Sequence, residues 1–205
     1  MDAQRAPTRA AVLELRAERG VVEEAYDFLD EKRLLLAAEL LRQLERYEAL
    51  RREIGEKTGA AREMLLAGVQ RHGLQGLSVY PPLSLDGVRI ETSGHNLMGV
   101  TLQEAAAAMP DAESAAAPPA AYPSAEAEAC RGVFREVFAL GAALAGISGN
   151  LYRLLAAYRA TERRARALEN VILPEIELAL SRMSTYLEEV DMEDAIRARL
   201  VQRSV

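Results

Sequence analysis

The stretch that decides the fold is residues 133–172, VFREVFALGAALAGISGNLYRLLAAYRATERRARALENVI. Apolar side chains, with one threonine among them, recur along it at alternating steps of four and three residues. This spacing keeps one stripe of an α-helix turned toward a partner helix, as in a coiled coil. The stripe consists of Val133, Val137, Leu140, Leu144, Ile147, Leu151, Leu154, Tyr158, Thr161, Ala165, Leu168 and Ile172.

The alternation changes directly after this stretch, close to Pro174. An additional step of four residues is a stutter, which locally unwinds a coiled coil. A proline inside a helix removes one backbone hydrogen bond and crowds the carbonyl four residues earlier, at a cost of about 3 kcal/mol. Because the apolar stripe resumes beyond the proline, the sequence predicts a helix that bends here and continues. The shifted stripe is Ile176, Leu180, Met183, Leu187 and Val190.

A second long helix is predicted over residues 7–72, which contain no proline after Pro7. Proline suits the first turn of a helix, and Gly73 is a natural stop. Two neighbouring rows of apolar residues repeat every seven positions, which predicts an amphipathic helix with a broad buried face. The first row is Leu15, Val22, Leu29 and Leu36, and the second is Val21, Phe28 and Leu35.

The segment between the helices, residues 73–124, differs in character. Val88, Ile90 and Thr92 alternate with charged residues, as in a half-buried strand. Residues 97–102 are expected to pair with this strand across the SGHN segment at 93–96. The following EAAAAMPDAESAAAPPAAYPS run has too little apolar bulk to fold alone and is interpreted as a mobile or extended loop.

The predicted fold is mainly α: a long antiparallel two-helix coiled coil with a small β-hairpin-containing insert at the turn end. Its three parts are a helix at 7–72, the insert at 73–124 and a helix at 125–203. Short connections favour antiparallel neighbours, so with His72 near Ser124 the numbers of facing residues should add up to about 196.

That register predicts opposite charges across the seam. Basic residues of the second helix should lie near acidic residues of the first, and the reverse near the chain ends, since flanking charges set orientation in coiled coils. The expected groups are Arg163, Arg164 and Arg166 with Asp30 and Glu31, and Glu188 and Glu189 with Arg5 and Arg9.

Composition supports long helices and argues against several protein classes. Hydrophobic residues make up 50% of the chain but aromatic residues only 5%, so alanine and leucine carry the apolar content. A net charge of −6 gives no general attraction to nucleic acid or to an anionic membrane. The single Cys130 excludes an internal disulfide and favours a reducing compartment. The first residues lack the apolar core of a secretory signal.

One uncharged stretch, Val137 to Tyr152, invites comparison with a membrane span. A helix of this length measures about 24 Å, whereas the hydrocarbon core of a bilayer is about 30 Å thick. Gly141, Gly146 and Gly149 within it suit close packing against another helix. We therefore predict a packed helix here.

No residue is predicted to be catalytic, and neither a cofactor site nor a metal site is predicted. A phosphate-binding loop needs a glycine before its lysine, but Lys57-Thr58 follows Glu56. His72 and His95 have no partners at metal-ligand spacing.

Three stretches resemble the D subunit of the V-type and A-type rotary ATPases. The first is EEAYDFLDEKRLLL, residues 23–36, with its lysine-arginine pair. The second is NLMGV, residues 96–100, which is similar to the family's hairpin signature. The third is TERRARALENVILPEIE, residues 161–177, which combines basic residues, Ala-Leu-Glu and a proline.

The resemblance implies a non-catalytic rotor shaft on the cytoplasmic side of a membrane, with both chain ends inside the catalytic hexamer. The implied partners are the catalytic and regulatory subunits of the hexamer, the small F subunit of the central stalk, and a stalk subunit linking to the membrane rotor ring. Nucleic acid and direct membrane insertion are not implied. The implied partner-binding residues are Lys32, Arg33, Asn96, Leu97, Met98, Gly99, Val100, Arg163, Arg164, Leu168, Glu169 and Pro174.

Two alternatives remain open at this point. Flagellar and type III export ATPases also carry a coiled-coil stalk, although these stalks generally lack a hairpin such as the one predicted at 86–102. A passive coiled-coil adaptor would use the apolar rows for helix pairing alone. An enzyme ranks third, because no group of residues supports catalysis.

Overall fold

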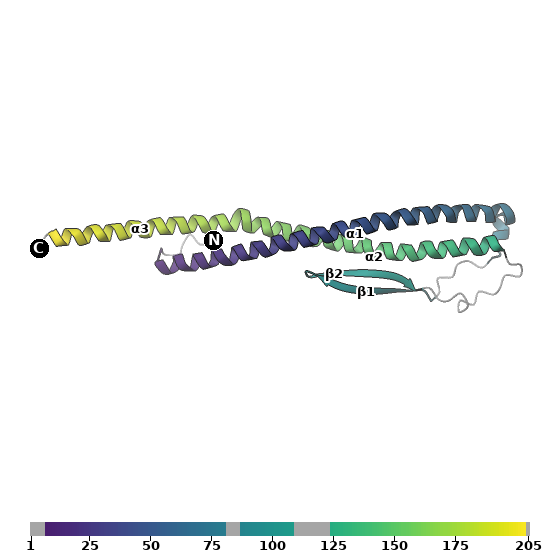
Figure 1. The fold of residues 1–205 in the computed structure, drawn as a ribbon, viewed down its shortest axis with the longest axis horizontal. Helices are drawn as coiled ribbons and strands as arrows, with labels where there is room; N and C mark the ends of the chain where they lie inside the picture. Colours follow the sequence, from purple (N-terminus) through teal and green to yellow (C-terminus); the bar gives the residue numbers. More distant parts are fainter. Residues whose placement is uncertain (1–6, 81–86, 109–123, 204–205) are drawn as a thin grey trace. The chain divides into compact units, whose positions relative to one another are not determined.

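The computed structural model describes residues 7–80, 87–108 and 124–203. Their elements, in chain order, are α1 (Arg9–Leu77), β1 (Arg89–Leu97), β2 (Val100–Ala108), α2 (Ala125–Ala167), a π-helical turn (Leu168–Ile172) and α3 (Leu173–Arg203), shown in Figure 1. The predicted fold class, two long helices with a small antiparallel hairpin between them, is confirmed. The chain divides into two compact units, the first formed by residues up to 35 and from 158 onward, the second by residues 36–157.

In the first unit, the beginning of α1 packs antiparallel against α3. Arg9 pairs with Asp191 at 2.9 Å and Arg19 with Glu177 at 3.7 Å, so the two helices run in opposite directions. Both ion pairs lie at the surface, where such pairs contribute little, and the apolar seam between the helices contributes more to stability. The buried residues of this seam are Ala11, Val12, Leu15, Ile176 and Met183.

In the second unit, the remainder of α1 pairs with α2 in the same antiparallel sense. Lys57 contacts Glu136 at 2.5 Å, and Arg71 contacts Glu126. Near the turn, His72 Nε2 lies 2.8 Å from the hydroxyl oxygen of the buried Ser124. The buried apolar residues of the two helices are Leu36, Ala61, Ile147 and Leu154.

The predicted register between the helices is confirmed. The residue numbers of the two surface pairs in the first unit add up to 200 and 196. In the second unit the pairs described above give 193, 197 and 196. The contact between His72 and Ser124 near the turn end agrees with this alignment, as expected for antiparallel neighbours that meet at one end.

The individual charge pairs predicted across the seam are wrong. Arg9 contacts Asp191 instead of Glu188 or Glu189. Asp30 pairs with Arg33, and Arg166 with Glu162, in each case on the same helix. Residues three or four positions apart on one helix are already close neighbours, so these local pairs form in place of the interhelical ones. Arg5 lies outside the described residues.

The broad buried face predicted for the first helix is also wrong. Leu15 and Leu36 of the first row are buried. Val21, Phe28 and Leu35 of the second row are 66%, 56% and 43% exposed. A single partner helix covers only a narrow stripe, whereas a wider apolar face needs more than one neighbour.

The helix around Pro174 does not end. It continues through the π-helical turn, in which the backbone N–H of Leu173 donates to the carbonyl of Leu168, five residues earlier. The side chain of Asn170 donates to the carbonyl of Arg166 at 3.1 Å. Ile176 and Met183 of the shifted stripe are buried, as predicted, whereas the predicted seam residue Ile172 is 37% exposed. A bend at this point stays a prediction.

Gly73 lies near the end of α1 and breaks its regular helical conformation, as expected. This glycine interrupts the helical conformation with φ 69° and ψ 164°, a combination that is essentially restricted to glycine. On the other side of the connection, the Ser124 hydroxyl accepts a hydrogen bond from the backbone N–H of Ala127 at 3.4 Å. Serine is a favoured residue at this capping position, so α2 begins where its cap satisfies a free backbone donor.

The hairpin turns at Met98 and Gly99, both of which have positive φ, 50° and 84°. Positive φ at both central residues is the signature of a type I′ turn, the preferred two-residue connection of twisted strands. The Asn96 side chain supports the turn, because its Oδ1 accepts a hydrogen bond of 2.8 Å from the Gly99 N–H.

The strand boundaries differ from those predicted in two respects. The SGHN segment at 93–96 is part of β1 and forms no turn. The first residues of the expected Ala/Pro loop, 104–108, belong to β2, and residues 109–123 lie outside the described residues. Small alanines allow β2 to approach α2 closely, which the composition of this segment did not reveal. The half-buried pattern expected for the first strand is wrong as well, since Ile90 is 61% exposed.

Gly146 is a point of close approach between the hairpin and α2. A Cβ at this position would lie 3.0 Å from the backbone nitrogen of Ala105 and 3.1 Å from its Cβ. Gly141, on the same helix, has no atom within 4 Å of its own Cβ position. One of the glycines predicted to allow close packing does so, but its neighbour is a strand. Within the second unit, the hairpin accordingly lies alongside α2 (Figure 1).

The uncharged part of α2 meets a simple criterion for a membrane span. The helical run from Ala125 to Leu200 contains a window with a mean hydropathy of 1.3. By length and composition alone this helix could cross a membrane, as could the core helix of a soluble protein, and 11% of the window is buried. Ile147, Asn150 and Leu154 of this helix are buried.

We expect Gly146→Ala to weaken the attachment of the hairpin by about 1–3 kcal/mol, because the added methyl group overpacks against Ala105. The matched variant Gly141→Ala should instead stabilise the helix, by up to about 1 kcal/mol. Hydrogen exchange of residues 100–108 and thermal unfolding measure the two effects. Equal changes in both variants would contradict the close approach at Gly146.

Candidate interaction site

The hairpin turn presents the residues that its sequence signature singled out. Val100 is buried, Leu97 and Met98 are half-buried, and Asn96 and Gly99 are exposed. Met98 is the one non-glycine residue with positive φ in the described part of the chain. For an L-residue this conformation costs about 1–2 kcal/mol, and such strain tends to persist at functional positions.

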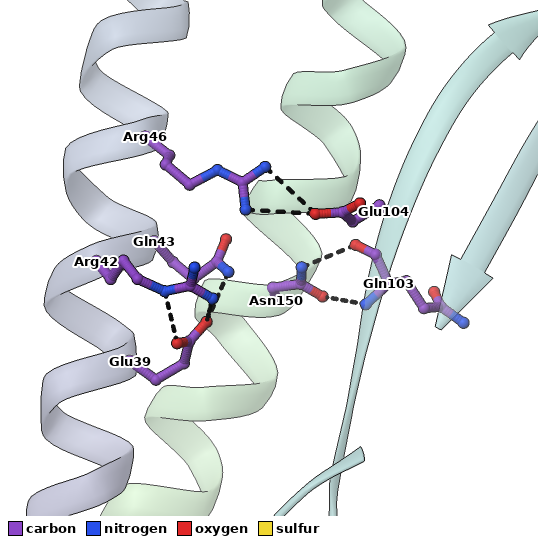
Figure 2. A network of polar contacts seen from close by, with 7 residues as sticks. All are labelled: Glu39, Arg42, Gln43, Arg46, Gln103, Glu104 and Asn150. Atoms are coloured by element: carbon purple, nitrogen blue, oxygen red, sulfur yellow. Dashed lines mark hydrogen bonds and ion pairs between the residues drawn. The ribbon is translucent and has the colours of Figure 1, made fainter. Parts of the chain in front are cut away.

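Polar contacts connect β2 to both helices of the second unit (Figure 2). The Arg46 guanidinium of α1 lies 3.3 Å from Glu104 of β2. On the other side, the buried Asn150 of α2 forms two hydrogen bonds of 2.8 Å with the backbone of Gln103. The position of the hairpin is thus determined by contacts with α1 and α2 as well as by its own turn.

A second group of polar residues lies on α1 beside this contact. Arg42 forms a bidentate pair with Glu39, with both nitrogen–oxygen distances at 2.8 Å. The hydrogen bond from Arg42 lowers the pKa of the Glu39 carboxyl, although partial burial of the carboxyl opposes this. Gln43, which is 2% exposed, also donates to Glu39 at 2.7 Å. Glu39 therefore stays ionised at neutral pH and orders its neighbours on the helix.

A cleft of about 430 Å³ lies between α1, α2 and the hairpin, and this polar network borders it. Gln43 and Asn150 form part of its wall, together with Arg46 and Glu104. The Oε1 atom of Gln43 is buried and has no hydrogen-bond partner in the structure. The cleft is thus bordered by this network and also by Ile147 of the apolar seam.

Sequence reasoning missed the residues of this network. Asn150 offered one signal, because it is a polar residue directly before the seam position Leu151. Arg46 and Glu104 offered none, because only the folding of the hairpin along α2 brings them together. Charged residues on a helix face are by default solvated.

The other predicted site residues belong to the first unit. Lys32 and Arg33 are half-buried, and Arg163 and Arg164 are exposed. The antiparallel register places these two pairs at the same level of the helix pair. Of the remaining three, Leu168 is half-buried, whereas Glu169 and Pro174 are exposed. The structure thus separates the predicted residues into a hairpin group and a helix group, and their roles stay predictions.

Charges around the π-helical turn act on Tyr26 of α1. The negative charge of Glu169 raises the pKa of the Tyr26 hydroxyl, with smaller contributions in the same direction from burial and from Asp30. Tyr26 therefore remains protonated at neutral pH.

The described residues give no arrangement typical of an active site. In that part of the chain, no group of three or more histidines, cysteines and acidic residues could hold a metal ion. Burial raises the pKa of the Cys130 thiol, which makes it a poorer nucleophile at neutral pH. His72 contacts Ser124 and packs against the ring of Tyr80, with ring centroids 5.2 Å apart.

Comparison with known proteins covers nearly the whole chain. The sequence is 25% identical to the D subunit of the V-type ATP synthase of Thermotoga neapolitana over 201 residues, which make up 98% of both chains. It is 30% identical to the D subunit of the A-type ATP synthase of Thermococcus sibiricus over 199 residues, or 96% of this chain and 92% of the relative. For the D subunit of the V-type ATP synthase of Anaeromyxobacter dehalogenans, the identity is 29% and the coverages are 95% and 93%.

The sequence profile of a protein family leads to the same assignment. The profile described as the D subunit of ATP synthase matches residues 11–203, a range that includes both long helices and the hairpin. The chain therefore belongs to the family of ATP synthase D subunits and is a member of an ATP synthase complex.

Proposed function

We propose that this chain is the central-stalk rotor shaft of a V/A-type rotary ATPase, which transmits torque between the catalytic hexamer and the ion-translocating ring in the membrane. The observation that carries the proposal is the family match over residues 11–203, which covers every element of the fold. In this proposal the chain itself is non-catalytic, and ATP is bound and hydrolysed on the partner subunits.

Paired helices suit a torque-bearing role. Twisting two packed helices must deform the side chains between them, and protein interiors resist such deformation because they are closely packed. Ion pairs at several levels, such as those of Arg9, Lys57 and Arg71, oppose sliding of one helix along the other. Each exposed pair contributes about 0–1 kcal/mol, so the buried seam supplies most of the resistance.

Exposed apolar residues support burial of the chain ends in a partner. Beyond Asp191, which faces the first turn of α1, the end of α3 has no helix opposite it among the described residues. Met192, Ile196 and Leu200 form a stripe there and are about three-fifths exposed (62%, 58% and 61%). Contiguous apolar surface of this kind marks interaction sites. We assign this end of the chain to the cavity formed by the catalytic and regulatory subunits. The basic residues at 32–33 and 163–164 are proposed to contact the same subunits.

The other proposed contacts involve the second unit. The hairpin turn at 96–100 contacts the small F subunit of the central stalk, and the region around Gly73 faces the stalk subunit that links to the membrane ring. The complex holds the chain at the cytoplasmic side of the membrane without inserting it. Pro174 and the π-helical turn make the shaft asymmetric about its long axis, so that it acts on one catalytic site at a time.

Purification of the tagged chain from its native cells tests the proposal directly. We expect the catalytic subunits of a rotary ATPase and a small companion protein to copurify, as identified by mass spectrometry. Recovery of an export ATPase, or of cytoskeletal or signalling proteins alone, would overturn the rotor assignment and leave the coiled coil in place.

Pro174→Ala should weaken rotary coupling in the reconstituted complex, because alanine restores the missing backbone donor and removes the reason for a widened turn. The measurement is ion transport per ATP hydrolysed. Glu188→Ala, an exposed change on the same helix, is the matched control. Coupling that is unchanged in Pro174→Ala would show that the turn merely fits the partner helix.

Met98→Asn should stabilise the hairpin by about 1 kcal/mol, because asparagine tolerates the left-handed conformation better than methionine. Hydrogen exchange of β1 and β2 measures this effect in the isolated chain. If the methionine side chain contacts the F subunit, the same variant should capture less of that protein. A more stable hairpin with unchanged capture would remove Met98 from the proposed contact.

A further inference from the structure

The backbone of β2 has one side that faces away from β1. In a two-residue hairpin the residues flanking the turn, Leu97 and Val100, form a hydrogen-bonded pair. From there along the strands, non-hydrogen-bonded and hydrogen-bonded pairs alternate. Gln103 is paired with Gly94 and stands at a position whose N–H and C=O point outward. Such groups need a partner when they are buried.

Asn150 supplies that partner with its side-chain amide (Figure 2). Its Oδ1 accepts a hydrogen bond of 2.8 Å from the Gln103 N–H, and its Nδ2 donates one of 2.8 Å to the Gln103 carbonyl. One side chain thus takes the place of a neighbouring strand at this residue. Asn150 is 2% exposed, so water cannot replace either bond without opening the contact.

Arg153 fixes the orientation of this amide. Its Nη2 donates to Asn150 Oδ1 at 2.7 Å, from one helical turn away. The guanidinium lies against Gly149, where a Cβ would be 3.5 Å from Nη2 and 3.6 Å from Nη1. Arg153 also has a buried Nε with no hydrogen-bond partner in the structure, an arrangement that costs free energy.

An amide with a fixed oxygen distinguishes the direction of a strand. Along β2 the N–H and C=O of Gln103 meet Oδ1 and Nδ2 in one order, and an antiparallel strand such as β1 would present them in the reverse order. A slip of β2 by one residue would turn toward Asn150 the groups that already pair with β1. Gly146, one turn earlier, adds the close contact with Ala105.

We propose that Arg153 and Asn150 are positioning residues that hold the hairpin on α2 in one direction and one register. They thereby orient the turn at residues 96–100 for its partner. The positioning itself stands on the contacts within this chain, and only the identity of the partner rests on the proposed function.

Hydrogen exchange of the Gln103 amide in the full chain, followed by NMR, tests the positioning. Arg153→Met should lower the protection of this amide by about tenfold, the effect of losing one charge-assisted hydrogen bond. Arg153→Lys, which keeps a donor without the planar fork, should lose less. Asn150→Leu, which removes both bonds to Gln103, should lose more. Arg159→Met, an exposed arginine of the same helix, is the matched control and should have no effect.

The pattern of protection separates positioning from general destabilisation. We expect reduced protection within β1 and β2, with the amides of α1 and α2 unchanged in all variants. Unchanged protection of Gln103 in Arg153→Met would overturn the proposal, and so would an equal loss in Arg159→Met or a loss spread over the helices.

Capture of the F subunit by the same variants distinguishes this proposal from the proposed function. If the unaltered chain captures no F subunit, the partner assignment fails and the exchange result for Gln103 still decides the positioning. If the unaltered chain captures the F subunit while Gln103 exchange is unchanged in Arg153→Met, the positioning fails and the partner assignment stands.

Discussion

The rest of this structure depends on the burial of a narrow apolar seam between antiparallel helices. In each unit the seam is about one side chain wide on each helix, with residues such as Leu15 and Ile176 in the first unit and Leu36 and Leu154 in the second. Each fully buried side chain contributes about 1.5–3 kcal/mol, while the polar contacts around the seam chiefly determine which residues face each other. The exposure of the neighbouring apolar rows follows from this narrow contact.

The π-helical turn reconciles this seam with a proline. A regular helix would bring the Pro174 ring against the carbonyl of Asn170. The longer hydrogen bond from Leu173 to Leu168 inserts an additional residue into the turn, which relieves that contact and shifts the apolar stripe at the same time. The side chain of Asn170 supplies a further donor to the carbonyl of Arg166. The stutter in the apolar spacing and the widened helical turn are therefore the same irregularity, the first seen in the sequence and the second in the structure.

Much of the fold could be predicted from the sequence because the relevant patterns are local. Heptad spacing predicted the helices, and the expected proximity of His72 and Ser124 predicted the register. The hairpin turn was misplaced because Ser93-Gly94 is a common turn pair, whereas the true turn uses a methionine in a conformation that methionine rarely adopts. The interhelical charge pairs were wrong because neighbours on one helix compete for the same partners. The contact of Asn150 with Gln103 was not predictable, since it depends on how closely a strand approaches a helix.

The exposed apolar rows have a consequence for the life of the chain before assembly. Val21, Phe28 and Leu35 face solvent in the free chain, as do many other large apolar side chains of both helices. Any partner that covers them binds the folded form alone, so by mass action the folded state is populated more fully inside the complex than outside it. A chain made in excess of its partners would open more often and present this surface to chaperones and proteases. The abundance of the protein in the cell would then be set by the supply of its partners.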